Sequence, residues 1–210
     1  MANLTDLTSK EFLTELASAA PAPGGGGGAA MAGALAAALS SMVCNLTLGK
    51  EKFAAQEAEV QAVLMKAERA RERLLELVQE DAAVFNSFMS CYKLPKATDE
   101  EKAVRTAAIR AAAKKAAEVP LAIARESFAV LELADELVVC GNPGVITDGA
   151  CSGLLARAAL RCAEYNVRIN LGLTKDAEWN AQVQAELEAM LTQAEALEAK
   201  LLAVTDKALA

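Results

Sequence analysis

The chain has 210 residues, of which 54% are hydrophobic and only 4% aromatic, and its formal net charge is −7. This length supports one sizeable core, and the abundance of alanine favours helix over sheet. Because basic residues are scattered along an acidic chain, nucleic acid is not an expected partner. Histidine is absent, which excludes His-based metal sites and leaves any proton transfer to Asp, Glu, Lys, Tyr or Cys.

Cysteine usage and the N-terminal sequence bear on the compartment. The five cysteines form no C-x-x-C pair, and their odd number argues against a disulfide framework. Asp6, Glu11 and Glu15 lie where a signal peptide would carry positive charge. We therefore expect a cytoplasmic protein with reduced thiols, folded as a single domain over residues 1–210.

The first predicted helix begins at a capping-box pattern, Thr8 with Glu11 three residues later. Its inward-facing residues should be Phe12, Leu13 and Leu16. The helix should stop before Pro21, because a residue that precedes proline avoids the helical conformation.

Five consecutive glycines, residues 24–28, run into about five turns of apolar helix that should end near Gly49. A helix that is apolar on every side should be buried on every side, and residues 29–48 predict a core helix rather than a membrane span because they are mostly Ala, Gly and Ser. The glycines leave backbone N–H groups bare at the positive end of the helix, where an anion or oxyanion can bind. On its own, however, the run fits a flexible, closely packed turn better, because it lacks the Lys-Ser/Thr ending of a phosphate loop.

A long second helix is expected over residues 52–92, with an apolar stripe at steps of three and four. Two charged residues, Arg71 and Asp81, stand on this stripe, and Asp81 lies between Val78 and Phe85 in its most apolar part. Burying an unpaired carboxylate costs several kcal/mol or raises its pKa. We therefore favour a functional role for Asp81 over the alternatives, an ion pair with a neighbouring helix or a stripe edge exposed to water.

Thr98 and Glu101 form a second capping box and predict a third helix that reaches Val139, with a kink or short interruption at Pro120. The basic residues of this helix fit a solvated face better than a site: Arg105, Arg110, Lys114 and Lys115. No segment shows the period-two alternation that is typical of a β-strand.

Residues 140–144 carry a strong turn signal, after which Asp148 is predicted as the N-cap of a fourth long helix. Capping alone could explain this residue. Asn166 and Asn170 share one face of that helix, where they could bond to neighbouring helices or to a heterocycle. A last helix over residues 176–208 repeats a shallow heptad seam, suited to packing on another helix or on a second copy of the chain.

These residues together resemble the cyclodeaminase/cyclohydrolase family. The matching stretches lie in order and cover nearly the whole chain: PAPGGGGGAAMAGALAAALSSMVCNLTLGK, EDAAVF, LPKATDEEKAVRTAAI, VPLAIA, GNPGVITDGA and NVRIN. The chain departs from the family pattern at Gly27 and Thr147, where serine is common. The first departure removes a possible hydroxyl ligand, and the second keeps one.

The resemblance implies an all-α, single-domain bundle of five to six long helices around a buried Ala/Gly-rich central helix, assembled as a homodimer. It implies a one-carbon tetrahydrofolate as substrate, with no metal. We expect no cofactor beyond this substrate and, from the composition of residues 29–48, no membrane. The resemblance also assigns Asp81 as the catalytic carboxylate, a base that stabilises the cation of the substrate. Asp148 would orient the pterin or share proton transfer, and Lys50 would protonate a departing nitrogen or hold a substrate carboxylate. The expected substrate-binding residues are Gly24, Gly25, Gly26, Gly27, Asn45, Asn142, Thr147, Asn166 and Asn170.

Three functions remain open at this point. Hydrolysis of methenyltetrahydrofolate is favoured for a chain with no formiminotransferase domain attached. Cyclodeamination of formiminotetrahydrofolate, which releases ammonia, would use similar groups. A non-catalytic helical dimer that binds folate or a partner protein would need neither the charge on the apolar stripe nor the glycine run.

Overall fold

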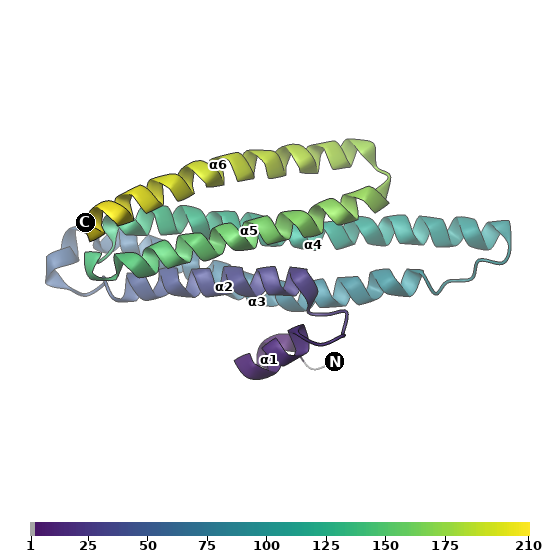
Figure 1. The fold of residues 1–210 in the computed structure, drawn as a ribbon, viewed down its shortest axis with the longest axis horizontal. Helices are drawn as coiled ribbons and strands as arrows, with labels where there is room; N and C mark the ends of the chain where they lie inside the picture. Colours follow the sequence, from purple (N-terminus) through teal and green to yellow (C-terminus); the bar gives the residue numbers. More distant parts are fainter. Residues whose placement is uncertain (1–2) are drawn as a thin grey trace.

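The computed structural model describes residues 3–210, which form six α-helices and three short 3₁₀ helices and contain no β-strand (Figure 1). The α-helices are α1 (Ser9–Leu16), α2 (Gly24–Asn45), α3 (Glu57–Cys91), α4 (Asp99–Cys140), α5 (Ile146–Thr174) and α6 (Ala177–Leu209). The 3₁₀ helices are η1 (Leu4–Asp6), η2 (Glu51–Gln56) and η3 (Pro143–Val145). The expected all-α bundle is therefore confirmed.

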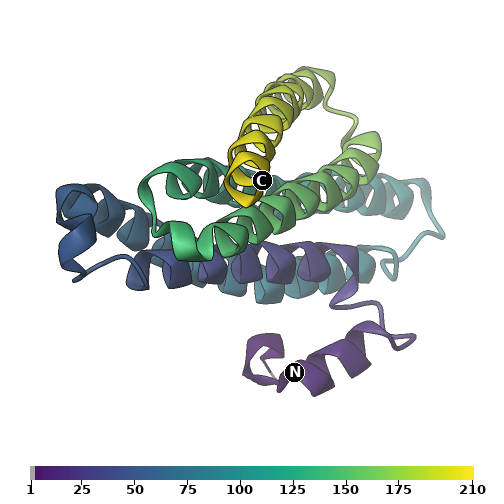
Figure 2. The same cartoon turned by 60° about the vertical axis from the view of Figure 1, so that its left-hand side comes forward.

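The long helices α2 to α5 run side by side, and α6 packs across α4 and α5 (Figures 1 and 2). The short α1 lies beneath α2, on the side away from α6. The paired helices α3 and α4 extend past the start of α2 and past the end of α5 (Figure 1). This overhang, residues 82–112, is called the arm below.

Small residues let α2 pack closely against α3, α4 and α5. A Cβ at Gly33 would lie 3.0 Å from Ser127 Oγ and 3.1 Å from a methyl group of Leu74, so a larger residue would push α2 away from α3 and α4. The buried hydroxyls of Ser40 and Ser152 are 2.8 Å apart and tie α2 to α5. The helix is long and apolar enough to cross a membrane, but 61% of its most apolar window is buried inside the fold, as expected for a core helix.

Three expectations about α2 are wrong. The helix begins at Gly24 rather than after the glycines, and it ends at Asn45, although Gly49 does adopt a left-handed conformation with φ of +71°. Nor is it buried on every side, because Leu35 is 54% exposed and Ala38 is also exposed. An apolar composition alone does not reveal which face the chain itself covers.

The predicted N-capping residues are confirmed at the starts of α1 and α4, but the one predicted for α5 is wrong. Thr8 and Thr98 both form complete capping boxes, with Glu11 and Glu101. Asp148 is not the N-cap of α5, which begins at Ile146 and has no side-chain cap. The side chain of Asn142 caps η3 instead, and η3 leads directly into α5. In α1, Phe12 is buried as predicted, but Leu13 is 61% exposed.

Helix α4 continues through Pro120 without the expected interruption. Proline lacks the N–H that would bond to the carbonyl four residues earlier, which is that of Ala116. Asn170 Nδ2 of α5 donates to this carbonyl at 2.9 Å. The amide of a neighbouring helix therefore satisfies the group that proline leaves free, and α4 remains continuous.

Candidate active site

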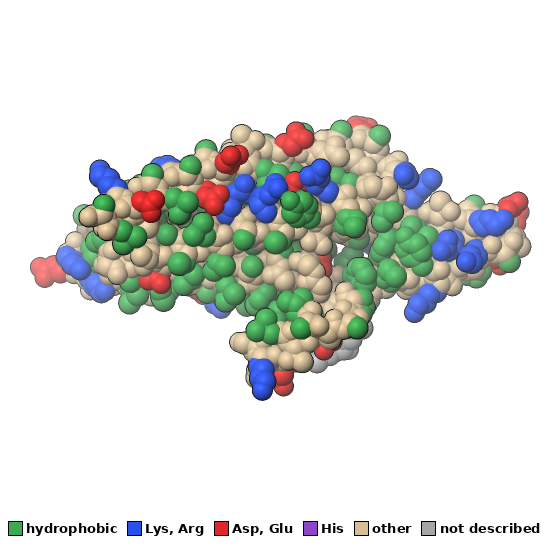
Figure 3. Space-filling view, in the orientation of Figure 1, with side chains coloured by type: hydrophobic (Ala, Val, Ile, Leu, Met, Phe, Trp, Pro, Cys, Tyr) green, Lys and Arg blue, Asp and Glu red, His purple; other side chains and the backbone are tan. Residues whose placement is uncertain are grey.

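The four long helices meet at one level where α2 starts, α5 ends and the arm begins. Gly26 of α2 lies against Asp81 of α3, Gly25 lies near Asn166 of α5, and Asn170 contacts Ala116 of α4. Figure 3 shows that the molecular surface is hollowed at this junction. The glycine run, Asp81 and the two asparagines, far apart in the sequence, are thus brought together.

Asp81 packs directly on the backbone of Gly26. A Cβ at Gly26 would lie 2.5 Å from Asp81 Oδ1 and 2.6 Å from its Cγ, distances that real Cβ atoms essentially never show. The carboxylate is half-buried and lies near the backbone N–H of Gly27, which donates to the carbonyl of Pro23 at 3.1 Å. Only glycine at position 26 leaves room for the carboxylate in this place.

Burial raises the pKa of Asp81 to about 6 from its ordinary value of 3.8, and the nearby backbone N–H of Gly27 opposes this shift only in part. Within residues 3–210, no Lys or Arg forms an ion pair with Asp81, so the predicted alternative of an ion pair does not apply. Arg71, the other charge on the stripe, pairs with Glu68 of its own helix. Asp81 is therefore a half-buried carboxylate without a cationic partner in its own chain.

The start of α2 places backbone N–H groups beside this carboxylate. Its N-cap residue is Pro23, which makes no side-chain cap, so the first backbone N–H groups have no cap partner within the described residues. Gly24 begins the helix with a left-handed φ of +56°. The positive end of the dipole of this 22-residue helix therefore also lies at the candidate site.

Asn166 and Asn170 hold the end of α5 in place. Asn166 Nδ2 donates to the carbonyl of Cys162 at 2.8 Å, and Asn170 Nδ2 donates to the carbonyls of Ala116 and Asn166, each at 2.9 Å. The Nδ2 groups of both asparagines therefore already donate to backbone carbonyls. The side-chain oxygens are the groups that could accept a hydrogen bond from a ligand.

The remaining predicted site residues lie at the other end of α2. Gly26 and Asn45 are separated by about 30 Å along the helix axis, from the rise of 1.5 Å per residue. Asn142 holds the end of α2 through a bond from its Nδ2 to the carbonyl of Leu46 at 3.0 Å. The other members of this distant group are Lys50, Thr147 and Asp148. Within one chain, these residues do not reach Asp81.

The arrangement at the start of α2 is suited to a cationic substrate. An unpaired carboxylate with a pKa near neutrality can stabilise a positive charge and accept a proton. The backbone N–H groups at the helix start can bind an oxygen that gains negative charge. A reaction in which water adds to a cationic carbon needs both groups.

Comparison with known proteins identifies the family. Residues 8–189 match the sequence model of the family described as Formiminotransferase-cyclodeaminase. The chain belongs to this family. A methenyltetrahydrofolate cyclohydrolase of Methylorubrum extorquens is 45% identical over 190 residues, which cover 90% of this chain and 91% of that protein.

Two further relatives, one by sequence and one by structure, are named as cyclodeaminases. The formimidoyltransferase-cyclodeaminase of Sus scrofa is 33% identical over 185 residues, which cover 88% of this chain but only 34% of that protein. The crystal structure of formiminotetrahydrofolate cyclodeaminase from Thermotoga maritima matches with a TM-score of 0.87 and 28% identity, over 97% of this chain and 98% of that chain. The predicted family is confirmed, and all three relatives are named as enzymes.

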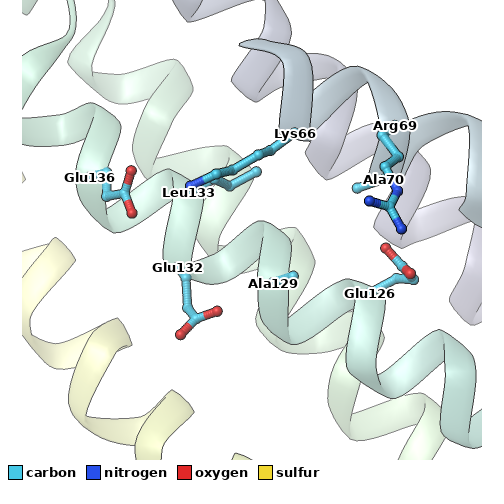
Figure 4. A pocket seen from close by; sticks show the side chains of 8 residues that line it. All are labelled: Lys66, Arg69, Ala70, Glu126, Ala129, Glu132, Leu133 and Glu136. Atoms are coloured by element: carbon cyan, nitrogen blue, oxygen red, sulfur yellow. The ribbon is translucent and has the colours of Figure 1, made fainter. Parts of the chain in front are cut away.

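A second hollow, of about 340 Å³, lies between α3 and α4 away from the glycine run (Figure 4). It is lined by Lys66 and Arg69 of α3 and by Glu126, Glu132 and Glu136 of α4, and Figure 4 shows Arg69 directed toward Glu126. Burial and the neighbouring Glu136 raise the pKa of Glu132. Lys66 lies about 22 Å from Asp81 along α3, so this charged groove is separate from the candidate site.

Sequence reasoning missed two contacts that shape the site. Pro23 lies against Gly27, where a Cβ would come within 2.8 Å of the proline ring. The role of Asn170 in bonding the carbonyl of Ala116 was also missed. A proline within a helical pattern was a usable signal, because it predicts a free carbonyl four residues earlier.

Proposed function

We propose that this chain hydrolyses methenyltetrahydrofolate to formyltetrahydrofolate, with Asp81 as the catalytic carboxylate. The observation that carries the proposal is the half-buried Asp81 carboxylate, which lies at the glycine start of α2 without a cationic partner in its own chain. The relative with 45% identity over nine-tenths of both chains is named for this reaction. Asn166 and the N–H groups of Gly24, Gly25 and Gly26 would line the substrate cleft.

The chemistry follows from the charge of the substrate. The methenyl carbon bridges two nitrogens and shares their positive charge, which the Asp81 carboxylate stabilises. Water adds to this carbon, Asp81 accepts one proton from the water, and the adduct oxygen faces the N–H groups at the start of α2. The adduct then loses one carbon–nitrogen bond, the departing nitrogen takes a proton, and one proton is released overall. Because the carbon is already an electrophile, we propose no metal or further cofactor.

The decisive experiment follows the absorbance of the methenyl chromophore with purified protein. Loss of the chromophore from methenyltetrahydrofolate above the buffer rate is the expected result. A parallel reaction starts from formiminotetrahydrofolate and measures both chromophore and ammonia. A protein that changes neither substrate would contradict both enzymatic functions and favour a non-catalytic helical scaffold.

Cyclodeamination is the alternative, because the Thermotoga maritima protein with the same fold is named for it. In that reaction a folate nitrogen attacks the formimino carbon, ammonia leaves, and the methenyl ring closes. Gain of the chromophore with release of ammonia would establish this activity. Both reactions place a cationic one-carbon unit beside Asp81, and we propose that either takes place in the cytoplasm, away from membranes and nucleic acid.

We also propose that the chain works as a homodimer through the joint face of α2 and α5. The exposed residues of α5 on this face recur at steps of three and four: Cys151, Leu154, Ala158, Cys162, Tyr165 and Ile169. Leu35 and Ala38 extend the same apolar surface onto α2, and Figure 3 shows hydrophobic side chains gathered over both helices. Such a large exposed apolar face is typical of an interface.

A two-fold axis across the middle of α2 would make the two α2 helices antiparallel. The distant end of the partner's α2 would then lie beside Asp81, which would bring the partner's Lys50 close to the unpaired carboxylate. Oppositely directed helix dipoles and the opposite charges of these two residues both favour this arrangement. It would also explain why Lys50, Thr147 and Asp148 lie far from Asp81 within one chain.

Mixing two inactive variants tests the shared site. Asp81→Asn and Lys50→Met should each form dimers with little activity, and their equimolar mixture should recover about a quarter of the parent activity, because half of the dimers would carry one intact site. A mixture of Asp81→Asn with Lys52→Met is the matched control. Because Lys52 has no role in the proposed site, Lys52→Met homodimers should be active, and this mixture should show activity before any exchange of subunits. A monomeric mass in light scattering, or no recovery after exchange of subunits, would contradict the shared site.

A further inference from the structure

The arm carries an aromatic strip that starts at Asp81. On α3, Val78 faces Gly27 and Asp81 faces Gly26, so this side of the helix points toward α2. The same side continues past the start of α2 at steps of three and four, through Phe85, Phe88 and Tyr92. We call these three residues the aromatic strip. Beyond the glycine run, α2 no longer covers this side of α3 (Figure 1).

The far end of the strip is a preformed aromatic and cationic group. The rings of Phe88 and Tyr92 meet edge to face at 5.3 Å. The guanidinium of Arg105 on α4 lies 5.4 Å from the ring of Tyr92 and donates two hydrogen bonds to the carbonyl of Tyr92, at 3.3 and 3.4 Å. Tyr92 is 40% exposed and Arg105 is partly exposed, whereas Phe88 is buried, so Tyr92 and Arg105 are the members of the group that a ligand can reach.

Arg105 has no carboxylate partner within residues 3–210, unlike its neighbour on the arm. Lys102, one turn earlier on α4, pairs with Asp99 at 2.8 Å. The interactions of Arg105 are with the ring and the backbone of Tyr92, and both leave its charge uncompensated. A planar guanidinium held in this way can bind a carboxylate through two parallel hydrogen bonds.

The spacing along the arm matches the shape of a folate. Asp81 and Tyr92 are separated by about 16 Å along α3. In a folate, the one-carbon unit is followed by a benzoyl ring and then by the carboxylates of glutamate, roughly 10–13 Å away by standard bond lengths. The difference is within the length of an arginine side chain. A one-carbon unit at Asp81 would therefore direct its ring along the strip and its glutamate toward Arg105.

We propose that the arm is the binding site for the p-aminobenzoyl-glutamate tail, with the benzoyl ring against Phe85 and Tyr92 and a glutamate carboxylate on Arg105. This inference rests on the proposed folate substrate and adds a subsite to it. It also replaces the simpler interpretation of Arg105 as part of a solvated basic face. The ring contact contributes apolar burial, and the ion pair selects ligands that carry the glutamate.

The test compares tetrahydrofolate with tetrahydropteroate, which lacks only the glutamate, by calorimetric titration. Arg105→Met should raise the Kd for tetrahydrofolate about tenfold, the effect of one charge-assisted hydrogen-bonded pair, and should leave the Kd for tetrahydropteroate unchanged. Phe85→Leu should raise the Kd for both ligands by a similar factor, because both carry the benzoyl ring. Lys102→Met is the matched control and should change neither Kd.

Binding is measured without turnover, so the result does not depend on which reaction the protein catalyses. If the parent protein binds both ligands equally, or if Arg105→Met weakens both equally, the tail subsite is wrong while the proposed reaction can still hold. If the parent protein prefers tetrahydrofolate and loses this preference in Arg105→Met, the subsite stands even when the chromophore assay shows no hydrolysis.

Discussion

Asp81→Asn should lower the rate of methenyltetrahydrofolate hydrolysis by about 100- to 10,000-fold, the range expected when a general base is removed. The amide has nearly the same shape as the carboxylate, but it cannot take a proton or balance the charge of a cation. The measurement is the initial rate of chromophore loss at saturating substrate. Glu80→Gln is the matched control, because Glu80 pairs with Arg73 and has no role in the mechanism.

The same substitution should stabilise the fold at neutral pH. The pKa of Asp81 is raised in the folded state, so its ionisation opposes folding as pH rises from 3.8 through about 6. The cost at pH 7 is about 3 kcal/mol, which Asp81→Asn should remove. Denaturant unfolding should show this gain at pH 7 and little difference near pH 3.5. An inactive variant that is also less stable than its parent at pH 7 would indicate a structural role for the carboxylate.

Gly26→Ala should abolish most activity and destabilise the fold by about 1–3 kcal/mol, the usual range for overpacking. The added methyl group would occupy the position that Asp81 Oδ1 and Cγ now approach, at 2.5 and 2.6 Å. Either the carboxylate must rotate away from the start of α2, or α2 must separate from α3. Both changes move the carboxylate from its place in the site, and chromophore loss together with urea unfolding measures the two effects.

Gly28→Ala is the matched control within the same glycine run. Its added Cβ would meet only a methyl group of Leu16, at the ordinary contact distance of 3.9 Å. Because alanine is the better helix former, this variant should gain roughly 0.5–1 kcal/mol of stability and keep its activity. Equal losses in Gly26→Ala and Gly28→Ala would mean that the run serves helix flexibility rather than the site.

Much of the helical architecture could be predicted from local signals. The capping boxes at Thr8 and Thr98 mark helix starts because their side chains satisfy backbone donors within three residues. Pro120 misled the prediction, since its missing hydrogen bond is replaced by Asn170, which lies on another helix. The exposed face of α2 could not be predicted either, because composition does not tell whether the chain or a second copy covers an apolar surface.

The candidate site was only partly predictable. Asp81 stood out because a charge on an apolar stripe is costly wherever it is placed. Its contact with Gly26 depends on how α2 and α3 align, which the sequence of either helix does not specify. Grouping Asp81 with Lys50 and Asp148 relied on the family resemblance, and one chain alone separates them by the length of α2.

The pH dependence of kcat/KM for methenyltetrahydrofolate tests most directly whether the Asp81 carboxylate is the base that acts on the cationic carbon. With the uncatalysed rate subtracted at each pH, kcat/KM should be flat above pH 7 and should fall about tenfold per unit below an apparent pKa of about 6, as Asp81 is protonated. In Asp81→Asn the small residual rate should lose this inflection. A parent profile with no inflection near pH 6, or the same inflection in the variant, would contradict the assignment.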